Sequence, residues 1–244
     1  MLLFLRMASL FRRNINFLIC DMAGTVVNEN GIIYNSLEKV LKNMGCTVTP
    51  EMKQSWYGQE KKKVLVDTLY EMDNIFPEVK NLKYLLAKAE HELENELNIN
   101  YFENGEIEVI DPSIFDFFSN LRINGVKVAL NTGYNSKLQR RIIEHVGLQG
   151  CVDDYISSDM CRIGRPYPYM IHNLMERNNI YDVRNVAKVG DTINDMWEGR
   201  NAGVGLRIGV LSGAETRANL FPHADVIVNK VTDLKDDDLP VFLL

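Results

Sequence analysis

The sequence predicts an α/β fold, a Rossmann-like parallel sheet that is interrupted by a block of helices. Short apolar runs alternate with helical patterns along most of the chain, which is typical of βαβ units with parallel strands. From about residue 32 to residue 100 the alternation stops, and the pattern is helical with no convincing strand. The length of 244 residues is long for one domain and short for two, which fits a single sheet domain that carries an insertion.

The elements of the sheet domain follow one another in regular order. Residues 16–20 form an apolar run that ends at Asp21 and predicts a buried strand. Further strands are predicted at residues 127–131, 154–157, 186–190, 205–210 and 225–228. Helices are predicted between them at residues 114–123, 136–146, 168–178 and 193–202.

The inserted block contains helices alone. Apolar residues recur at helical spacing in residues 36–43, 63–70 and 82–97. Thr49 followed by Pro50 is typical of a helix start, and Pro77 separates the last two helices. We therefore expect a discontinuous core domain at residues 14–31 and 101–244, with a helical domain at residues 32–100.

The composition excludes several classes of protein. Lys and Arg total 27 against 33 Asp and Glu, a net charge of −6, so we expect no nucleic-acid partner held by phosphate contacts. The four cysteines form no C-x-x-C pair, which favours reduced thiols and a cytoplasmic protein over a zinc site. No run approaches the roughly 20 apolar residues of a spanning helix, so no membrane partner is expected. Residues 1–13 lack the order of a signal peptide and form no part of the predicted fold.

Polar residues stand where three predicted strands end. Asp21 follows the first strand, the pair Thr132–Gly133 follows another, and Asp191 and Asp195 lie four residues apart after a third. Arg165 stands in a turn between a glycine and a proline. Because ligands of parallel sheets bind beyond the carboxyl ends of the strands, we expect these residues to share one site.

The residue types at these strand ends suit phosphoryl transfer. Two carboxylates can hold a hard cation such as Mg²⁺, while an arginine and backbone donors can hold a phosphoryl group. A carboxylate next to the cation can attack phosphorus and form an aspartyl-phosphate. Taken singly, each residue has an ordinary explanation as a helix cap, a turn residue or a surface charge. The combination on a βαβ chain is what indicates a phosphoryl site.

The chain resembles the haloacid dehalogenase (HAD) superfamily of phosphotransferases. The matching segments are residues 17–25, 131–133, 164–166 and 189–195. Two longer segments, residues 164–170 and 188–203, resemble the phosphonatase branch, which comprises phosphonoacetaldehyde hydrolase and its relatives. The resemblance implies a HAD-like core with an inserted α-helical cap domain, and a Mg²⁺ cofactor.

The resemblance also implies roles for individual residues. Asp21 would be the nucleophile, and Asp21, the carbonyl of Ala23 and Asp191 would hold Mg²⁺. Phosphoryl or phosphonyl binding would fall to Thr132, Gly133 and Arg165. Asp195 would orient Arg165 or a metal-bound water.

Ala23 and Lys61 indicate which reaction of the superfamily to expect. Superfamily phosphatases carry a general acid where this chain has Ala23, and a methyl group cannot transfer a proton. The phosphonatase branch also has alanine there and uses a cap lysine that forms a Schiff base with its aldehyde substrate. Lys61 follows Gly58 by three positions, as that lysine does. Repulsion from Lys62 and Lys63 could keep Lys61 neutral, although three consecutive lysines can also form a solvated helix face.

The chain departs from the phosphonatase pattern at Gly31, Tyr57 and Val64, where the branch has cysteine, methionine and histidine. Three functions therefore stay open. The first is a Mg²⁺-dependent hydrolase of a small phosphonate or phosphate metabolite that works through an aspartyl-phosphate, as phosphonoacetaldehyde hydrolase does. The second is a phosphomonoesterase similar to phosphoglycolate phosphatase, and the third is a non-catalytic HAD-fold binding protein. The oligomeric state stays open, a homodimer included.

Overall fold

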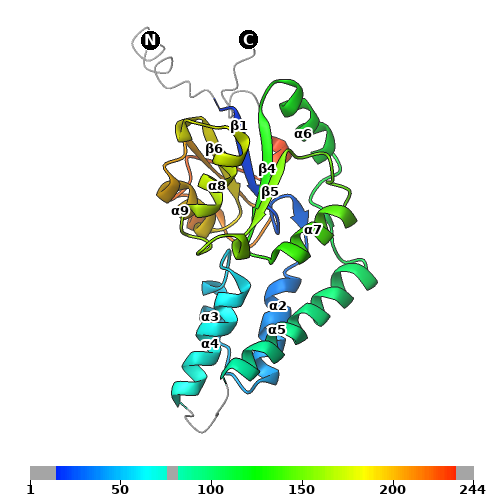
Figure 1. The fold of residues 1–244 in the computed structure, drawn as a ribbon, viewed down its shortest axis with the longest axis vertical. Helices are drawn as coiled ribbons and strands as arrows, with labels where there is room; N and C mark the ends of the chain where they lie inside the picture. The colour runs from blue at the N-terminus through cyan, green and yellow to red at the C-terminus, as the bar shows by residue number, and fades with distance from the viewer. Residues whose placement is uncertain (1–14, 76–81, 235–244) are drawn as a thin grey trace.

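A computed structural model of the chain describes residues 15–75 and 82–234. The expectations for residues 1–13 and for Pro77 lie outside the described residues. The described part contains a six-stranded parallel sheet in the order β5-β4-β1-β6-β7-β8, and the predicted α/β fold is confirmed (Figure 1). Its strands are β1 (Phe17–Asp21), β4 (Lys127–Thr132), β5 (Asp154–Ser157), β6 (Val186–Gly190), β7 (Leu206–Val210) and β8 (Val226–Val228).

Strand β1 lies in the middle of the sheet and sets the position of the strand ends. Asp21 pairs in register with Asn131 of β4, and Cys20 pairs with Val189 of β6. All five residues of β1 are buried, because helices cover both faces of the sheet. The parallel register brings the residues that follow β1, β4 and β6 to one edge of the sheet.

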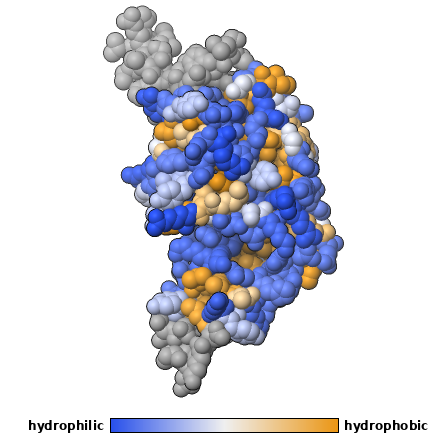
Figure 2. Space-filling model, in the orientation of Figure 1, coloured by the Kyte–Doolittle hydropathy of each residue, from blue (hydrophilic) through white to orange (hydrophobic). Residues whose placement is uncertain are grey.

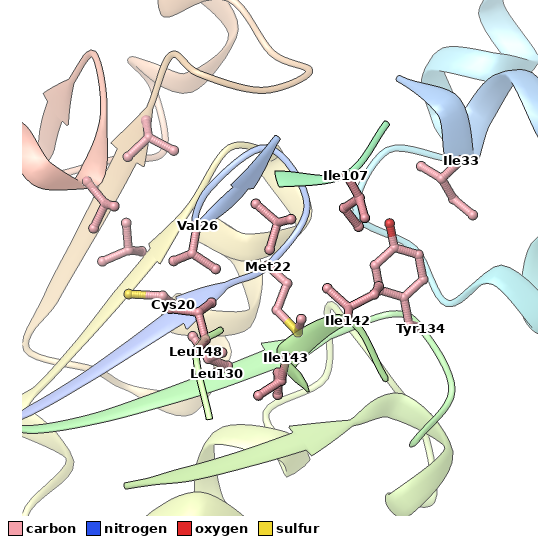
Figure 3. Packing of buried hydrophobic residues seen from close by; sticks show 14 of the residues in the cluster. Cys20, Met22, Val26, Ile33, Ile107, Leu130, Tyr134, Ile142, Ile143 and Leu148 are labelled. Atoms are coloured by element: carbon pink, nitrogen blue, oxygen red, sulfur yellow. The ribbon is translucent and has the colours of Figure 1, made fainter. Parts of the chain in front are cut away.

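Alternate side chains of β1 belong to two different apolar clusters. Leu18 and Cys20 pack in a cluster with residues of α6 (Ile114–Ile123) and α7 (Ser136–His145), part of which Figure 3 shows. Phe17 and Ile19 pack in a second cluster, with residues of α8 (Tyr169–Asn178) and α9 (Ile193–Ala202). The alternation follows from the period of two along a strand. The two pairs of helices lie on opposite sides of the sheet in Figure 1.

The helices of residues 32–98 lie together at one end of the sheet (Figure 1). They are α2 (Ile32–Asn43), α3 (Pro50–Ser55), α4 (Lys61–Ile75) and α5 (Leu82–Asn98), and the last continues into a π-helix at Ile99–Glu103. Helix α5 packs against both α2 and α4. We call these four helices the helical block. The prediction of helices without strands in this segment is confirmed for the described residues.

Three short elements, two strands and one helix, were not predicted from the sequence. Strand β2 (Val27–Asn28) pairs antiparallel with β3 (Glu108–Val109), where the chain leaves the sheet domain and where it returns. Strands of two residues are too short to show a period of two. Helix α10 (Arg217–Leu220) was also missed.

Hydrophilic residues cover most of the face shown in Figure 2. Within the described ranges, we find no helix with the length and apolar character needed to cross a bilayer.

Candidate active site

A small pocket lies at the carboxyl end of the sheet, where the α3–α4 loop (residues 56–60) meets the strand ends. Its free volume is about 10 Å³, which corresponds to about one water molecule. It is lined by Asp21, Ala23, Tyr34, Gly58, Lys61, Thr132, Gly133, Tyr134, Arg165, Asp191 and Thr192. Every site residue expected from the sequence lines this pocket except Asp195, which lies behind it. We call it the strand-end pocket.

Arg165 and Asp21 form a buried ion pair in the strand-end pocket. The Nη2 atom of Arg165 lies 2.7 Å from Oδ1 of Asp21, and both side chains are almost inaccessible to solvent. Burial raises the pKa of Asp21, although the charge of Arg165 opposes the rise. The guanidinium is therefore placed where it can contact both Asp21 and an anionic group bound beside Asp21.

Asp195 holds Arg165 from the other side. Its Oδ1 atom lies 2.6 Å from Nη1 of Arg165 and 2.9 Å from Nζ of Lys188, and its Oδ2 atom accepts a hydrogen bond from Oγ1 of Thr192 at 2.5 Å. Burial alone would raise the pKa of Asp195, but Arg165 and Lys188 hold it below its usual value. Asp195 also completes a capping box with Thr192 at the start of α9, so helix formation and arginine placement use one carboxylate.

Lys188 and Glu198 extend this network and were not identified as site residues from the sequence. Lys188 is fully buried within β6, and its Nζ atom lies 2.6 Å from Oδ1 of Asn131 and 3.4 Å from Oε2 of Glu198. Burial alone would lower the pKa of Lys188, but Asp195 and Glu198 outweigh it and keep the pKa raised. The sequence does contain a signal for Lys188, a single lysine inside an apolar strand, because a lysine buried there needs buried partners.

Asp191 differs from the other buried carboxylates, because among the described residues it forms no ion pair with a lysine or arginine. Burial, then the charges of Asp21 and Asp195, raise the pKa of Asp191 well above its usual range. Its Oδ2 atom accepts a hydrogen bond from the backbone amide of Ala214 at 2.7 Å. A Cβ atom at Gly213 would lie 2.0 Å from Oδ2, so this glycine leaves the room that Asp191 occupies.

These carboxylates fit a divalent cation. One oxygen from each of Asp21, Asp191 and Asp195 lies within 4.8 Å of the others. Asp195 is already occupied by Arg165 and Lys188, so Asp21 and Asp191 are the better ligands, and Ala23 lines the same pocket. A buried carboxylate that faces two others and no paired cation is stabilised by a metal ion.

The α3–α4 loop closes the strand-end pocket through close backbone contacts. The backbone amide of Lys61 donates to the carbonyl of Gly133 at 3.3 Å, and a Cβ atom at Gly133 would lie 2.7 Å from the carbonyl oxygen of Gln59. Gly58 has a φ of +71°, and a Cβ atom there would lie 2.2 Å from Oγ1 of Thr192. Only glycine allows this conformation and this approach together.

The amine of Lys61 points into the strand-end pocket. Its Nζ atom lies 4.7 Å from the centre of the Tyr34 ring, and the Tyr34 hydroxyl accepts a hydrogen bond from the amide of Gly58 at 3.0 Å. Burial and then the charge of Arg165 lower the pKa of Lys61 to about 8, while Asp21 and other carboxylates oppose the fall. Lys61 is thus closer to neutral at physiological pH than an exposed lysine.

The expected repulsion of Lys62 and Lys63 on the amine of Lys61 is not found. Lys62 is exposed and pairs with Glu90 at 2.9 Å, and Lys63 is exposed and pairs with Asp67. Their charges are solvated and paired outside the pocket, and the cation that lowers the pKa of Lys61 is Arg165. The run of three lysines therefore divides into one half-buried residue and two on a solvated helix face.

A larger cavity of about 350 Å³ adjoins the strand-end pocket between α4, α5 and α7. It shares Lys61, Gly133 and Tyr134 with the smaller pocket. A volume in this range is typical of small-molecule sites.

Comparisons with known proteins show the family to which the chain belongs. A family model of haloacid dehalogenase-like hydrolases matches residues 15–203. Phosphonoacetaldehyde hydrolase of Bacillus cereus is 31% identical over 213 residues, which cover 82% of this chain and 77% of that protein. Phosphonoacetaldehyde hydrolase of Bacillus cytotoxicus is 39% identical over 95 residues, or 38% of this chain and 36% of that protein.

Solved structures share the fold. A phosphonoacetaldehyde hydrolase-like protein from Oleispira antarctica has a TM-score of 0.73 at 20% identity and covers 93% of this chain and 92% of its own. A predicted phosphoglycolate phosphatase from Haemophilus somnus has a TM-score of 0.72 at 17% identity, with coverage of 90% and 96%. From the family match and the strand-end motifs, we conclude that the chain is a hydrolase that belongs to the haloacid dehalogenase-like family and resembles the phosphonoacetaldehyde hydrolases within it.

Proposed function

We propose that the protein is a Mg²⁺-dependent hydrolase that cleaves the P–C bond of a small phosphonate bearing an aldehyde or ketone group. One observation carries the proposal: the carboxylate of Asp21 and the amine of Lys61 line the same pocket, while position 23 offers only a methyl group. A site of this kind has a nucleophile for phosphorus and an amine for a carbonyl, but it lacks the acid that a phosphate ester needs at position 23.

The phosphoryl half of the site is formed by residues of the sheet domain. Asp21, the carbonyl of Ala23 and Asp191 would hold Mg²⁺, which would reduce the repulsion between Asp21 and an anionic substrate. The phosphonyl oxygens would be bound by Thr132, Gly133 and Arg165. Asp195 would act by positioning Arg165, because it contacts the guanidinium directly.

The part of the site that would react with the carbonyl group of the substrate is formed by the helical block. The neutral amine of Lys61 adds to the substrate carbonyl, the adduct takes up one proton, and the carbonyl oxygen leaves as water to give an iminium ion. A carboxylate oxygen of Asp21 then attacks phosphorus, the P–C bond breaks, and its electron pair passes to the iminium to form an enamine. Water hydrolyses the aspartyl-phosphate to phosphate, and a second water releases the carbonyl product from Lys61.

We further propose that residues 32–100 act as a cap over a core formed by residues 14–31 and 101–244. The strand-end pocket holds about one water molecule, so a substrate can enter only when the α3–α4 loop moves away from Gly133. Closure would then exclude bulk water from the reacting groups.

The test is turnover with Mg²⁺ of phosphonoacetaldehyde and, in parallel, of a panel of phosphate esters that includes phosphoglycolate. We expect phosphate and acetaldehyde in equal amounts from the aldehyde, much slower turnover of the esters, and no products with the Asp21→Asn variant. Fast ester hydrolysis with no reaction of the aldehyde would support the phosphomonoesterase instead. A non-catalytic binding protein is not supported, because the chain belongs to a hydrolase family and its strand-end residues converge.

A further inference from the structure

A buried carboxyl group and two tyrosines form a hydrogen-bonded chain beside the strand-end pocket. The Tyr101 hydroxyl donates to Oε2 of Glu29 at 2.9 Å, and the hydroxyls of Tyr101 and Tyr134 lie 2.8 Å apart. Glu29 is 6% exposed, Tyr101 is inaccessible and Tyr134 is 3% exposed. We call these three residues the Glu29 relay.

Each member of the relay comes from a different part of the chain. Glu29 precedes α2, Tyr101 lies in the π-helix after α5, and Tyr134 follows β4. Figure 3 shows the Tyr134 hydroxyl pointing toward Ile33 and Ile107, where the chain enters and leaves the helical block. Tyr134 also lines the strand-end pocket, so the relay connects that pocket to a buried carboxyl group.

The surroundings of Glu29 favour its protonated form more than water does. Burial raises the pKa of Glu29, while hydrogen bonds from Ile33 and Tyr101 and the charge of Lys61 oppose the rise. The other ionisable groups that face it are the hydroxyls of Tyr34 and Tyr134. A buried carboxyl group with a raised pKa and a hydrogen bond to a hydroxyl chain has the environment typical of groups that transfer protons.

We propose that the Glu29 relay carries protons between nitrogen and oxygen while Lys61 forms its adduct with the carbonyl of the substrate. This inference rests on the proposed function and adds a route for its protons. Tyr134 would face the substrate, and Glu29 and Tyr101 would act through it as positioning residues. In the described part of the chain, the two carboxylates that line the strand-end pocket, Asp21 and Asp191, would be engaged in phosphoryl transfer, which leaves Glu29 for this task.

The proton balance of adduct formation explains why a relay is needed. A protonated Lys61 carries three N–H bonds, and the iminium keeps one of them. The N–C bond forms, the C–O bond breaks, and the two lost protons end on the carbonyl oxygen, which leaves as water. Glu29 accepts a proton from nitrogen and returns it to oxygen through the two hydroxyls, so that it ends in its starting state.

The experiment measures the rate of adduct formation. Wild-type protein is mixed with phosphonoacetaldehyde and quenched with borohydride at timed intervals, and the reduced adduct is quantified by intact mass. In Tyr101→Phe and Glu29→Gln we expect the rate to fall by about 10²-fold, the lower end of the usual contribution of acid–base catalysis. The matched control is Tyr70→Phe, which removes a hydroxyl from an exposed tyrosine on α4.

Two further measurements separate proton transfer from a structural role. In Tyr101→Phe the charge of Glu29 remains, so the pH midpoint of adduct formation should stay near that of the wild type while the plateau rate falls. Binding of inorganic phosphate with Mg²⁺ should be unchanged. Glu29 also accepts a hydrogen bond from the Ile33 amide at 2.8 Å, so if Glu29→Gln unfolds, Tyr101→Phe and Tyr134→Phe decide the result.

The possible outcomes distinguish the two proposals. A wild-type adduct whose rate is unchanged in all relay variants would overturn the relay and leave the proposed function intact. A fall in adduct rate that comes with an equal loss of phosphate binding would also overturn the relay, because it would indicate a distorted pocket. Absence of any wild-type adduct would overturn both proposals.

Discussion

The Nη2 atom of Arg165 lies 2.7 Å from Oδ1 of Asp21, inside a site where both side chains are almost inaccessible to water. The arginine is held there by Asp195, which binds its other terminal nitrogen at 2.6 Å. Two carboxylates thus fix one guanidinium in place, and the fork geometry of arginine makes this possible. The position of Arg165 is therefore determined by the protein before any substrate binds.

Asp195→Asn should destabilise the protein and weaken phosphate binding. Removing one charge from a buried network leaves Arg165 and Lys188 less compensated, at a cost of about 3 kcal/mol in the free energy of unfolding. Guanidinium titration measures this loss. The control is Asp182→Asn, which breaks an exposed pair with Arg184 and should leave the unfolding midpoint almost unchanged. An Asp195→Asn variant as stable as the wild type would contradict this description of the network.

Mg²⁺ should stabilise the wild-type protein and fail to stabilise Asp191→Asn. A ligand that binds only the folded state raises the unfolding temperature with its concentration. The repulsion between Asp191 and Asp21 is the feature that the cation relieves, and the amide variant removes one of the two charges. Thermal unfolding across a Mg²⁺ series measures the effect. Equal stabilisation of the two proteins would place the cation elsewhere.

Adduct formation at Lys61 should increase with pH and level off above about pH 8. The pKa of Lys61 is lowered to about 8, so below that value the amine is mostly protonated and cannot attack a carbonyl, whereas above it the neutral amine dominates. The pH dependence of the borohydride-trapped fraction gives the midpoint. Lys62→Ala should leave that midpoint unchanged, because Lys62 is exposed and paired with Glu90. A midpoint near 10.5, the usual value for lysine, would show that the amine is not desolvated.

Gly58→Ala should lower kcat/KM by about 10²-fold. The added methyl group would lie 2.2 Å from Oγ1 of Thr192, so the α3–α4 loop must move and carry Lys61 with it. Gly105→Ala is a matched control, because Gly105 has a similar φ of +69° and nothing within 4 Å of its added Cβ atom. It should reduce stability by about 1 kcal/mol and leave the activity unchanged. Equal activity losses in the two variants would show that backbone strain, and not loop contact, is responsible.

Much of the fold was predictable because its signals are local. Helix α6 has the bounds that its apolar spacing predicts, Ile114–Ile123, and each predicted strand of the sheet is present. Helix α2 begins at Ile32, four residues before the predicted start, and its N-cap residue is Gly31, which offers no side-chain cap. A helix start without a side-chain cap lacks the usual sequence signal, so the pattern of the sequence did not show it.

The site was predictable where its residues follow strand ends. Parallel register brings Asp21, Thr132 and Asp191 together without further information. The Glu29 relay was not predictable, because Glu29 and Tyr101 lie 72 residues apart and meet only through the path of the helical block. In the sequence, each member of the relay also looks ordinary. Glu29 looks like an acidic residue in a loop, and Tyr101 and Tyr134 look like aromatic residues that fill a core.

The central claim is that Lys61 forms a covalent bond with a carbonyl substrate in the pocket that holds Asp21. The most direct measurement is peptide mapping of the chain after reduction with borohydride in the presence of phosphonoacetaldehyde. We predict a stable adduct on Lys61 that disappears in Lys61→Ala and persists in Lys62→Ala. An adduct that survives Lys61→Ala, or the absence of any adduct on the wild-type chain, would contradict the claim.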